Sequence, residues 1–394
     1  KTFLLSSNNQ YFLPEINRIL NKKNKKTLSF SYSYSIKSKL KSLFFLFLNT
    51  FFIKKYTKAT FFLIPKNLMR YQDVSREIYR IFPKEIGIAT DYKNKLIDDI
   101  SKYLIFTDGL QNYFKSFIED TKDMTAILHA TRFPELYSIA SIMSKYKFNS
   151  FLITHGTHTL QNKNSLGYIA NEQLALALLF SKLKNIIHCS PSIFSDDYLL
   201  SKNYEFKKIY PLNVLQKKKI NKTRTKIQIL HASTVKNLNF RTFYYESSFE
   251  YIDGLKLLAK KLENLSNKVE IIVRPRFIEN ELTNEFLKKE LQELSHIIRL
   301  TENKNFLLDL SNCDCLISLS STTLEQAFNM KIPCLSFGYT NYDHFANYNH
   351  LNINNDLDNY YALREIEKLL GRKFLYSDNP INKREDFMSL LLNN

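Results

Sequence analysis

The feature that most constrains the fold is a regular alternation of short apolar runs with segments of helical periodicity. Helical patterns, such as the one at residues 135–146, carry apolar residues on one face and separate the runs. This rhythm of strand, helix and strand builds a mostly parallel sheet covered by helices. No repeat of 20 to 50 residues is visible, which excludes solenoids and propellers. The apolar runs lie at residues 60–64, 103–106, 125–129, 150–154, 186–189, 227–231, 269–273, 297–300 and 315–318.

A polar, basic stretch without periodicity at residues 212–226 interrupts this alternation, and we interpret it as a linker. The 394 residues are enough for two domains, each with its own core. The predicted fold class is α/β, with two Rossmann-like doubly wound domains at 1–211 and 227–372 facing a central cleft, and a closing helical segment at 373–394. Open α/β sheets bind ligands at the carboxyl ends of their strands, so both domains would line that cleft.

The composition favours anionic partners, because 56 Lys+Arg against 38 Asp+Glu leave a formal charge of +18. The accompanying abundance of asparagine, isoleucine and phenylalanine is also typical of an AT-rich genome, so the charge carries little weight by itself. A nucleic-acid-binding protein would gather its basic residues with aromatics on one face. Here they are scattered along the chain, and no nucleic-acid partner is predicted.

The four cysteines show no zinc-finger spacing, and three of them lie in apolar surroundings typical of small core residues. This pattern suits a reducing compartment, and the start of the sequence shows no secretory signal, so we expect a cytoplasmic protein. Residues 43–53 are apolar and flanked by lysines, but are shorter than the about 20 residues needed to cross a bilayer. Two interpretations stay open: a peripheral contact with the anionic inner face of the cytoplasmic membrane, or a buried element of the first domain.

A turn of four hydroxyl residues, 320–323, follows the apolar run at 315–318 and opens a helix. Exposed N–H groups and the helix dipole make such a turn a site for an anion, and phosphate is the expected guest. The alternative is that Ser321 or Thr322 only caps the helix. Glu325 lies one turn further, about 5 Å along the axis. Its carboxylate would accept hydrogen bonds from both hydroxyls of a ribose. The alternative is that Glu325 is a solvated surface residue.

Polar residues follow two other apolar runs of the second half. His231 ends the run at 227–231 and precedes Ser233 and Thr234. The tripeptide at 274–276, Arg-Pro-Arg, follows the run at 269–273. Arginine suits bidentate recognition of phosphate or carboxylate, so these residues favour an anionic nucleotide donor over a neutral ligand.

In the first half, Asp108 and Gly109 come directly after the run at 103–106, which we predict to be a strand. An acid at a strand end, beside a glycine that lets a substrate approach the backbone, is placed as a general base would be. The alternative is an ordinary Asp-Gly turn.

His155, Gly156 and His158 follow the run at 150–154, and Arg132 follows another run as a further anion contact. Two histidines on a loop that contains glycine can bind a phosphate or carboxylate, or shuttle a proton near neutral pH. A metal would need a third ligand, and none stands at a persuasive spacing, so no metal is predicted.

The chain lacks the sequence motifs of several enzyme classes. The chain has only seven glycines and contains neither the Walker pattern G-x-x-x-x-G-K-[ST] nor G-x-G-x-x-G. It also lacks the G-x-S-x-G elbow of many hydrolases. ATPases and dinucleotide oxidoreductases therefore lose their main support.

Across about residues 100 to 340 the motifs together resemble those of bacterial GT-B glycosyltransferases that use CMP-sugars. The groups that these motifs resemble are the lipooligosaccharide sialyltransferases, the polysialyltransferases and the capsule Kdo transferases. Sialyltransferases carry Asp/Glu-Asp/Glu-Gly, His-Pro and Ser-Ser motifs, which are similar to residues 107–109, 274–275 and 320–321 here. His155-Gly156 is similar to an element of capsule Kdo transferases and polyol-phosphate transferases. Thr107 in place of an acid and Arg274 in place of histidine are departures, so the sugar is left open among ulosonic and nonulosonic acids.

The resemblance implies a metal-independent transferase that moves Kdo, sialic, pseudaminic or legionaminic acid from a CMP-sugar, with no other cofactor, to a cell-surface glycan or glycolipid such as lipooligosaccharide or capsule. The first domain would bind the acceptor and the second the nucleotide sugar. The catalytic residues would be Asp108, as the general base, and His155. The donor site would comprise His231, Ser233, Thr234, Arg274, Pro275, Arg276, Ser320, Ser321, Thr322 and Glu325. The acceptor or the sugar carboxylate would meet Gly109, Arg132, Gly156 and His158.

The alternative enzyme is a CDP-polyol phosphotransferase of the teichoic-acid or capsule type. The mass of the product would distinguish the two, because that enzyme transfers a phosphate together with the polyol. If Asp108 deprotonates the acceptor on the face opposite CMP, the anomeric centre inverts. The capsule Kdo transferases retain it, so the stereochemistry stays open, as do the acceptor and the oligomeric state.

Overall fold

The computed structural model describes the chain in segments that form two compact units. The first unit comprises residues 1–153 and 176–189, and the second comprises residues 154–175 and 190–394. The described residues are 2–5, 16, 20, 23, 26–32, 57–61, 73–77, 80, 97–98, 100–101, 104, 107–108, 123–129, 134–154, 158–160, 163, 168–209, 226–232, 248–275, 284–303, 305–318, 322–337 and 361–375.

The first sheet has seven strands in the order β3-β2-β1-β4-β5-β6-β7. Its pairings from β3 through β6 are all parallel. Every residue of β4 is buried, as expected for a strand covered on both faces. The strands are β1 (Thr2–Leu5), β2 (Lys26–Tyr32), β3 (Thr57–Phe61), β4 (Met124–His129), β5 (Asn149–Ile153), β6 (Ile186–Ser190) and β7 (Phe206–Lys208). Among the described residues, the helices with defined bounds in this part of the chain are α5 (Pro134–Lys145), α6 (Tyr168–Ala177) and α7 (Ile193–Ser201).

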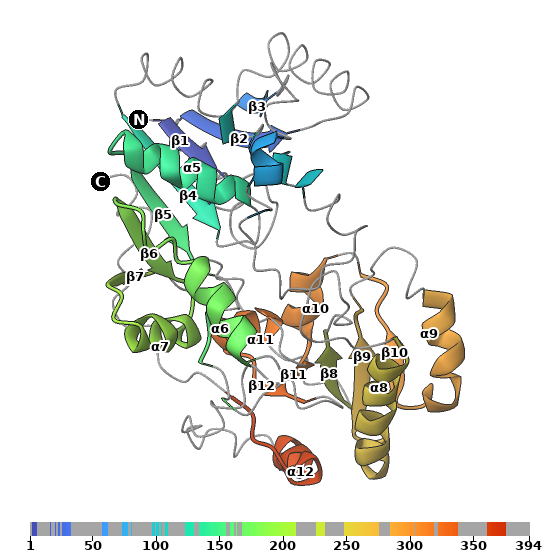
Figure 1. The fold of residues 1–394 in the computed structure, drawn as a ribbon. Helices are drawn as coiled ribbons and strands as arrows, with labels where there is room; N and C mark the ends of the chain where they lie inside the picture. The colour runs from blue at the N-terminus through green and yellow to red at the C-terminus, as the bar shows by residue number, and fades with distance from the viewer. Residues whose placement is uncertain are drawn as a thin grey trace. The chain divides into compact units, whose positions relative to one another are not determined.

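The second sheet has five strands in the order β10-β9-β8-β11-β12, all parallel (Figure 1). After β12, Leu375 forms one antiparallel bridge with Cys334. The strands are β8 (Ile227–His231), β9 (Val269–Val273), β10 (Ile298–Leu300), β11 (Cys315–Ser318) and β12 (Cys334–Ser336). The helices are α8 (Ser248–Leu262), α9 (Asn284–Glu290), α10 (Phe306–Asn312), α11 (Thr322–Asn329) and α12 (Tyr361–Leu370), with short 3-10 turns η1 (Glu263–Leu265) and η2 (Gln292–Leu294).

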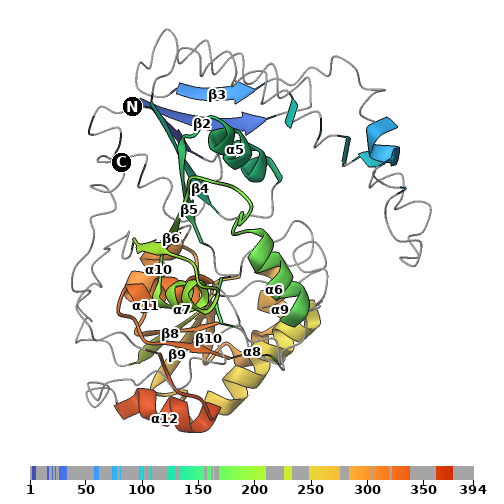
Figure 2. The ribbon, with the colours of Figure 1, turned by 60° about the vertical axis from the view of Figure 1, so that its left-hand side comes forward.

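The second sheet buries both of its faces because successive strand residues point to opposite sides. Ile229 and Ile271 belong to a core formed with α8, α9 and α12. Their neighbours Leu230 and Ile272 belong to a second core formed with α10, α11 and Phe194 of α7. Figure 2 accordingly shows α10 and α11 on one side of this sheet and α8 and α12 on the other. Helices on both faces of a parallel sheet confirm the predicted doubly wound, Rossmann-like class.

Most predicted elements are confirmed. The predicted strands at 227–231, 269–273 and 315–318 and the predicted helix at 306–312 match β8, β9, β11 and α10. All four cysteines are buried and unbonded to one another, and the three predicted to be core residues are among them.

Of the strand predicted at 103–106, only Leu104 is described, and it is helical rather than extended, as are Ile97, Ile100 and Asp108. The strand prediction is therefore wrong at Leu104. Residues 97, 100 and 104 recur at helical spacing and are half-buried, whereas Asp108 is exposed. The Ser101 hydroxyl donates to the Ile97 carbonyl one turn earlier, at 2.7 Å. A run of only four apolar residues cannot distinguish a strand from one turn of an amphipathic helix, and the longer spacing decides it here.

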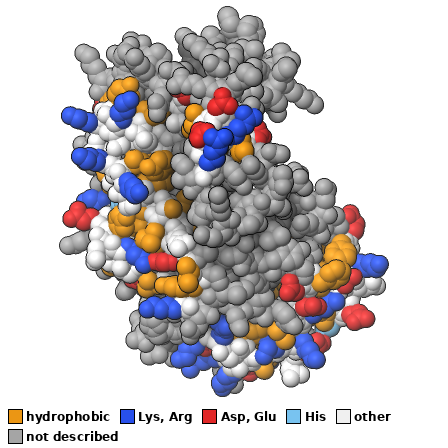
Figure 3. Space-filling view, viewed as in Figure 1, with side chains coloured by type: hydrophobic (Ala, Val, Ile, Leu, Met, Phe, Trp, Pro, Cys, Tyr) orange, Lys and Arg blue, Asp and Glu red, His pale blue; other side chains and the backbone are white. Residues whose placement is uncertain are grey.

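Some predicted segments lie outside the described residues: the membrane-contact candidate at 43–53, most of the linker at 212–226 and residues 376–394 of the closing segment. The domain boundaries and the cleft between the domains stay predictions. Within the described part of the chain, no helix has the length and apolar character needed to cross a membrane. Lys and Arg side chains occur at separate places on the face in Figure 3, with acidic and apolar side chains between them.

Candidate functional site

Neighbouring strands of the second sheet end at residues that the sequence singles out. The parallel register pairs His231 of β8 with Ile317 of β11 and with Val273 of β9. The Arg274 N–H donates to the His231 carbonyl at 2.8 Å. Because the carboxyl ends of parallel strands share one edge, His231, Arg274 and Ser318 are brought to the same edge of the sheet.

Two hydroxyl groups, one at the end of β11 and one in the first turn of α11, bind the backbone that follows β8. The Ser318 hydroxyl donates to the Ala232 carbonyl at 2.6 Å, and the Thr323 hydroxyl donates to the same oxygen at 3.2 Å. Thr322 is the first residue of α11 and is half-buried. These bonds tie the start of α11 to the end of β8, where the donor phosphate is predicted to bind.

Glu325 lies in the first turn of α11 and is only 1% exposed. The alternative that Glu325 is a solvated surface residue is therefore wrong. The reason is that both faces of the sheet are covered, so α11 turns this position inward together with Leu324. Contact of its carboxylate with a ribose stays a prediction.

His231 does not supply the positive charge that an anion site would use. Burial lowers its pKa from 6.5 to about 4, so the imidazole is neutral at pH 7. Its ring meets the ring of Tyr251 edge to face, with centroids 6.0 Å apart. A neutral imidazole still offers one N–H and one acceptor nitrogen, so His231 would contact a ligand through a hydrogen bond.

The stability of the protein is expected to fall below pH 6.5, because two histidines, His231 and His188 of β6, are buried in the neutral form. Burial lowers the pKa of His188 and of His231 to about 4. Between pH 6.5 and pH 4 the unfolded chain binds protons that the folded chain does not, so the free energy of unfolding decreases by up to about 3 kcal/mol for each histidine. Urea unfolding followed by far-UV circular dichroism at pH 5 to 7.5 would measure this. The variants His188→Gln and His231→Gln should each flatten the decline, and an unchanged pH dependence would contradict the assignment.

Arg274 is held by a network of hydrogen bonds at the end of β9. Its Nη1 donates to Asp309 Oδ2 at 2.6 Å and to the Asn303 carbonyl at 2.7 Å. Asp309 also accepts from the Thr301 hydroxyl at 2.9 Å and from Asn303 Nδ2 at 2.5 Å. Side-chain exposure is 18% for Arg274 and 5% for Asp309, so the ion pair is largely shielded from water. The guanidinium therefore has one orientation in this structure.

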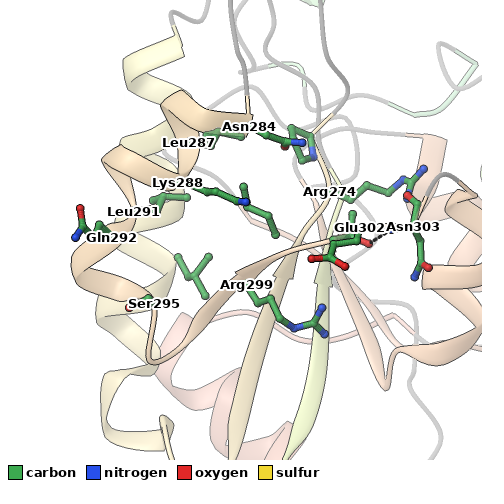
Figure 4. Close-up of a pocket in the computed structure, with 14 residues that line it drawn as sticks. Arg274, Asn284, Leu287, Lys288, Leu291, Gln292, Ser295, Arg299, Glu302 and Asn303 are labelled. Atoms are coloured by element: carbon green, nitrogen blue, oxygen red, sulfur yellow. Dashed lines mark hydrogen bonds between the residues drawn. The ribbon is translucent and has the colours of Figure 1, made fainter.

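A cavity of about 890 Å³ opens beside this network, between α9, β10 and the end of β9. Figure 4 shows Arg274 and Asn303 on one side of it and Leu287 and Lys288 of α9 on the opposite side. Leu287 and Ile298 give it an apolar floor, and its size is in the range of small-molecule sites. Its polar lining includes Arg274, Lys288, Thr301, Glu302 and Asn303.

His158 is fully buried inside the second unit. Its Nε2 donates to the Ala175 carbonyl at 3.0 Å, and its ring meets that of Tyr198 edge to face at 5.5 Å. This position lends no support to a contact with a sugar carboxylate, which stays a prediction. The sequence predicted a loop that contains glycine, but it did not reveal that α6 and α7 contact this histidine.

Asp108 is exposed and has helical backbone, rather than standing at a strand end. Its neighbour Thr107 places its hydroxyl 3.0 Å from that of Ser138 in α5. Ser138 lies about 6 Å along the axis from Pro134, at the start of α5, and α5 follows the carboxyl end of β4. Thr107 therefore lies beside α5, and the function of Asp108 stays a prediction.

Nine of the predicted site residues lie outside the described part of the chain, and their functions stay predictions. They are Gly109, Arg132, His155, Gly156, Ser233, Thr234, Arg276, Ser320 and Ser321. Among the residues that are described, no three His, Cys, Asp or Glu side chains cluster as metal ligands would.

Asp309 is a member of the site that sequence reasoning missed. A signal was present, because it is an acid within the apolar stretch Phe306, Leu307, Leu308 and Leu310 of α10. An acid there must either face solvent or accept hydrogen bonds from buried donors. Its donors belong to residues 274, 301 and 303, and their spacing in the sequence does not predict that they meet Asp309.

Comparisons with known proteins give weak matches. The sequence matches no protein-family model and no curated protein. Among solved structures, S. aureus MnaA with UDP has 13% identity and a TM-score of 0.47, covering 100% of this chain and 95% of that one. An S. aureus TarM complex containing UDP has 9% identity and a TM-score of 0.46, covering 86% and 85%. The UDP-GlcNAc 2-epimerase of Neisseria meningitidis has 13% identity and a TM-score of 0.42, covering 100% of both chains.

Proposed function

We propose that this chain is a glycosyltransferase that moves an acidic 3-deoxy sugar from a CMP-sugar to a cell-surface glycan. The observation that carries the proposal is the position of Arg274 and Pro275. They follow β9 at the carboxyl edge of a Rossmann-like sheet and line a cavity of about 890 Å³. These residues are also the ones that resemble the His-Pro motif of CMP-sugar transferases.

The charges near this edge suit an anionic donor. Arg274 and Lys288 line the cavity, whose acidic lining residue is Glu302. The leaving CMP and the carboxylate of an ulosonic acid are both negative, and guanidinium or ammonium groups stabilise such charge most strongly where water is partly excluded. The first turn of α11, with Thr322 and Glu325, would take the phosphate and the ribose.

In the proposed reaction Asp108 takes the proton from the acceptor hydroxyl, whose oxygen attacks the anomeric carbon while the bond to CMP breaks. The CMP phosphate leaves as an anion and needs no protein acid, because its charge is met by Arg274 and the N–H groups at the start of α11. The acceptor, the sugar and membrane contact by residues 43–53 remain parts of the proposal.

Isothermal titration calorimetry at moderate salt tests the donor class. We expect CMP and CDP to bind with dissociation constants in the micromolar to millimolar range typical of substrates. UMP and UDP are the matched controls, because they differ from CMP and CDP in the base alone. A site specific for cytidine should bind them at least about tenfold more weakly. A folded protein that binds none of the cytidine nucleotides would refute the proposal. Product mass then separates transfer of a sugar from transfer of a polyol phosphate.

A further inference from the structure

We propose that Asp309 is a positioning residue, which shapes one wall of the cavity and orients Arg274 toward an oxyanion of the ligand. The proposal rests on the proposed function for the identity of that ligand. Asp309 does not line the cavity, yet three residues that do, Arg274, Thr301 and Asn303, donate to its carboxylate. One buried carboxylate therefore organises side chains from the ends of two strands and the loop that follows.

The geometry fixes the plane of the guanidinium. Both hydrogens of Arg274 Nη1 are used, one by Asp309 and one by the Asn303 carbonyl. A planar group with two bonds at one end cannot rotate without breaking them. An oxyanion in the cavity would then meet an arginine whose orientation is already set, so less conformational entropy would be lost on binding.

The same carboxylate holds the loop between β10 and α10. The Thr301 hydroxyl donates to Asp309, and the Asn303 N–H contacts that hydroxyl at 3.2 Å. Asn303 also donates its side-chain amide to Asp309. These contacts shape residues 301–303, which form the rim of the cavity (Figure 4).

Stability alone does not account for an acid at this position. The neighbouring residues of α10 are apolar, and Leu310 is fully buried in the core. Replacing a buried ion pair by apolar side chains of similar volume is often neutral or stabilising. A carboxylate whose donors all lie along one wall of a cavity is better explained by the shape of that wall.

The test compares Asp309→Asn with Asp314→Asn by calorimetric titration of CMP. Asp314 is a matched control because it is also buried and accepts a backbone hydrogen bond, from Gln228 at 2.8 Å, but lies at the amino end of β11. We expect Asp309→Asn to weaken CMP binding roughly 30-fold and Asp314→Asn to change it less than twofold.

A double-mutant cycle separates positioning from general damage. If Asp309 acts through Arg274, then Asp309→Asn adds no further loss of CMP affinity in an Arg274→Gln background. An equal loss in both backgrounds, or affinities for both CMP and a CMP-sugar within twofold of wild type for Asp309→Asn alone, would overturn the inference.

The results that would refute the proposed function differ from those that would refute the role of Asp309. A wild-type protein that binds UDP but not CMP refutes the CMP donor, and the same cycle with UDP then decides the role of Asp309. A wild-type protein that binds CMP and a CMP-sugar with no dependence of either affinity on Asp309 refutes only the inference. A protein that binds CMP, CDP, UDP and inorganic phosphate equally poorly refutes both.

Discussion

The variant Asp108→Asn is expected to lower kcat by roughly 10² to 10⁴-fold while leaving CMP affinity within about twofold of wild type. An amide cannot take the proton of the acceptor hydroxyl, but it preserves the size of the side chain. Because Asp108 is exposed on its helix, the folded state should lose little stability. Steady-state kinetics with a CMP-sugar and calorimetry with CMP would measure the two parameters separately.

The matched control for this variant is Asp98→Asn. Asp98 is another exposed acid with helical backbone, ten residues before Asp108 in the sequence. It should retain wild-type turnover. If Asp108→Asn also retains turnover, then Asp108 is not the general base and another group on the acceptor side must take the proton.

The variant Arg274→Gln is expected to weaken CMP binding by roughly 100-fold, through loss of the charge that meets the phosphate. It also leaves the buried Asp309 carboxylate without its cation, so the free energy of unfolding should fall by about 3 kcal/mol. Calorimetry and urea unfolding would measure these two effects independently.

Three titrants identify the group that Arg274 recognises. Cytidine lacks the phosphate, so its affinity should be the same for wild type and Arg274→Gln if the arginine binds phosphate. A loss that appears with a CMP-sugar but not with CMP would instead assign Arg274 to the sugar carboxylate. In the double variant with Asp309→Asn, stability should partly recover while CMP affinity does not. Unchanged affinity for all three titrants in Arg274→Gln would exclude it from the donor site.

The second sheet could be predicted closely because its signals are local. Each of β8, β9 and β11 is an apolar run of four or five residues bounded by polar residues, and α10 has an N-cap, Asn305, whose side chain accepts from Leu307. The parallel alternation then placed His231, Arg274 and the start of α11 at one edge. The helical conformation of Leu104 and Asp108 was missed because a run of four apolar residues does not distinguish a strand from one turn of an amphipathic helix.

By itself, the sequence determined the class of fold, most strand positions and the set of polar residues at strand ends, because these depend on apolar periodicity and on the topology of parallel sheets. Only the tertiary structure decided which of those residues are buried and what they bind. It made His231 neutral, enclosed Glu325, turned His158 inward and joined Arg274 to Asp309, a residue 35 positions away. Burial and long-range hydrogen bonding depend on packing between elements, and no local pattern encodes them.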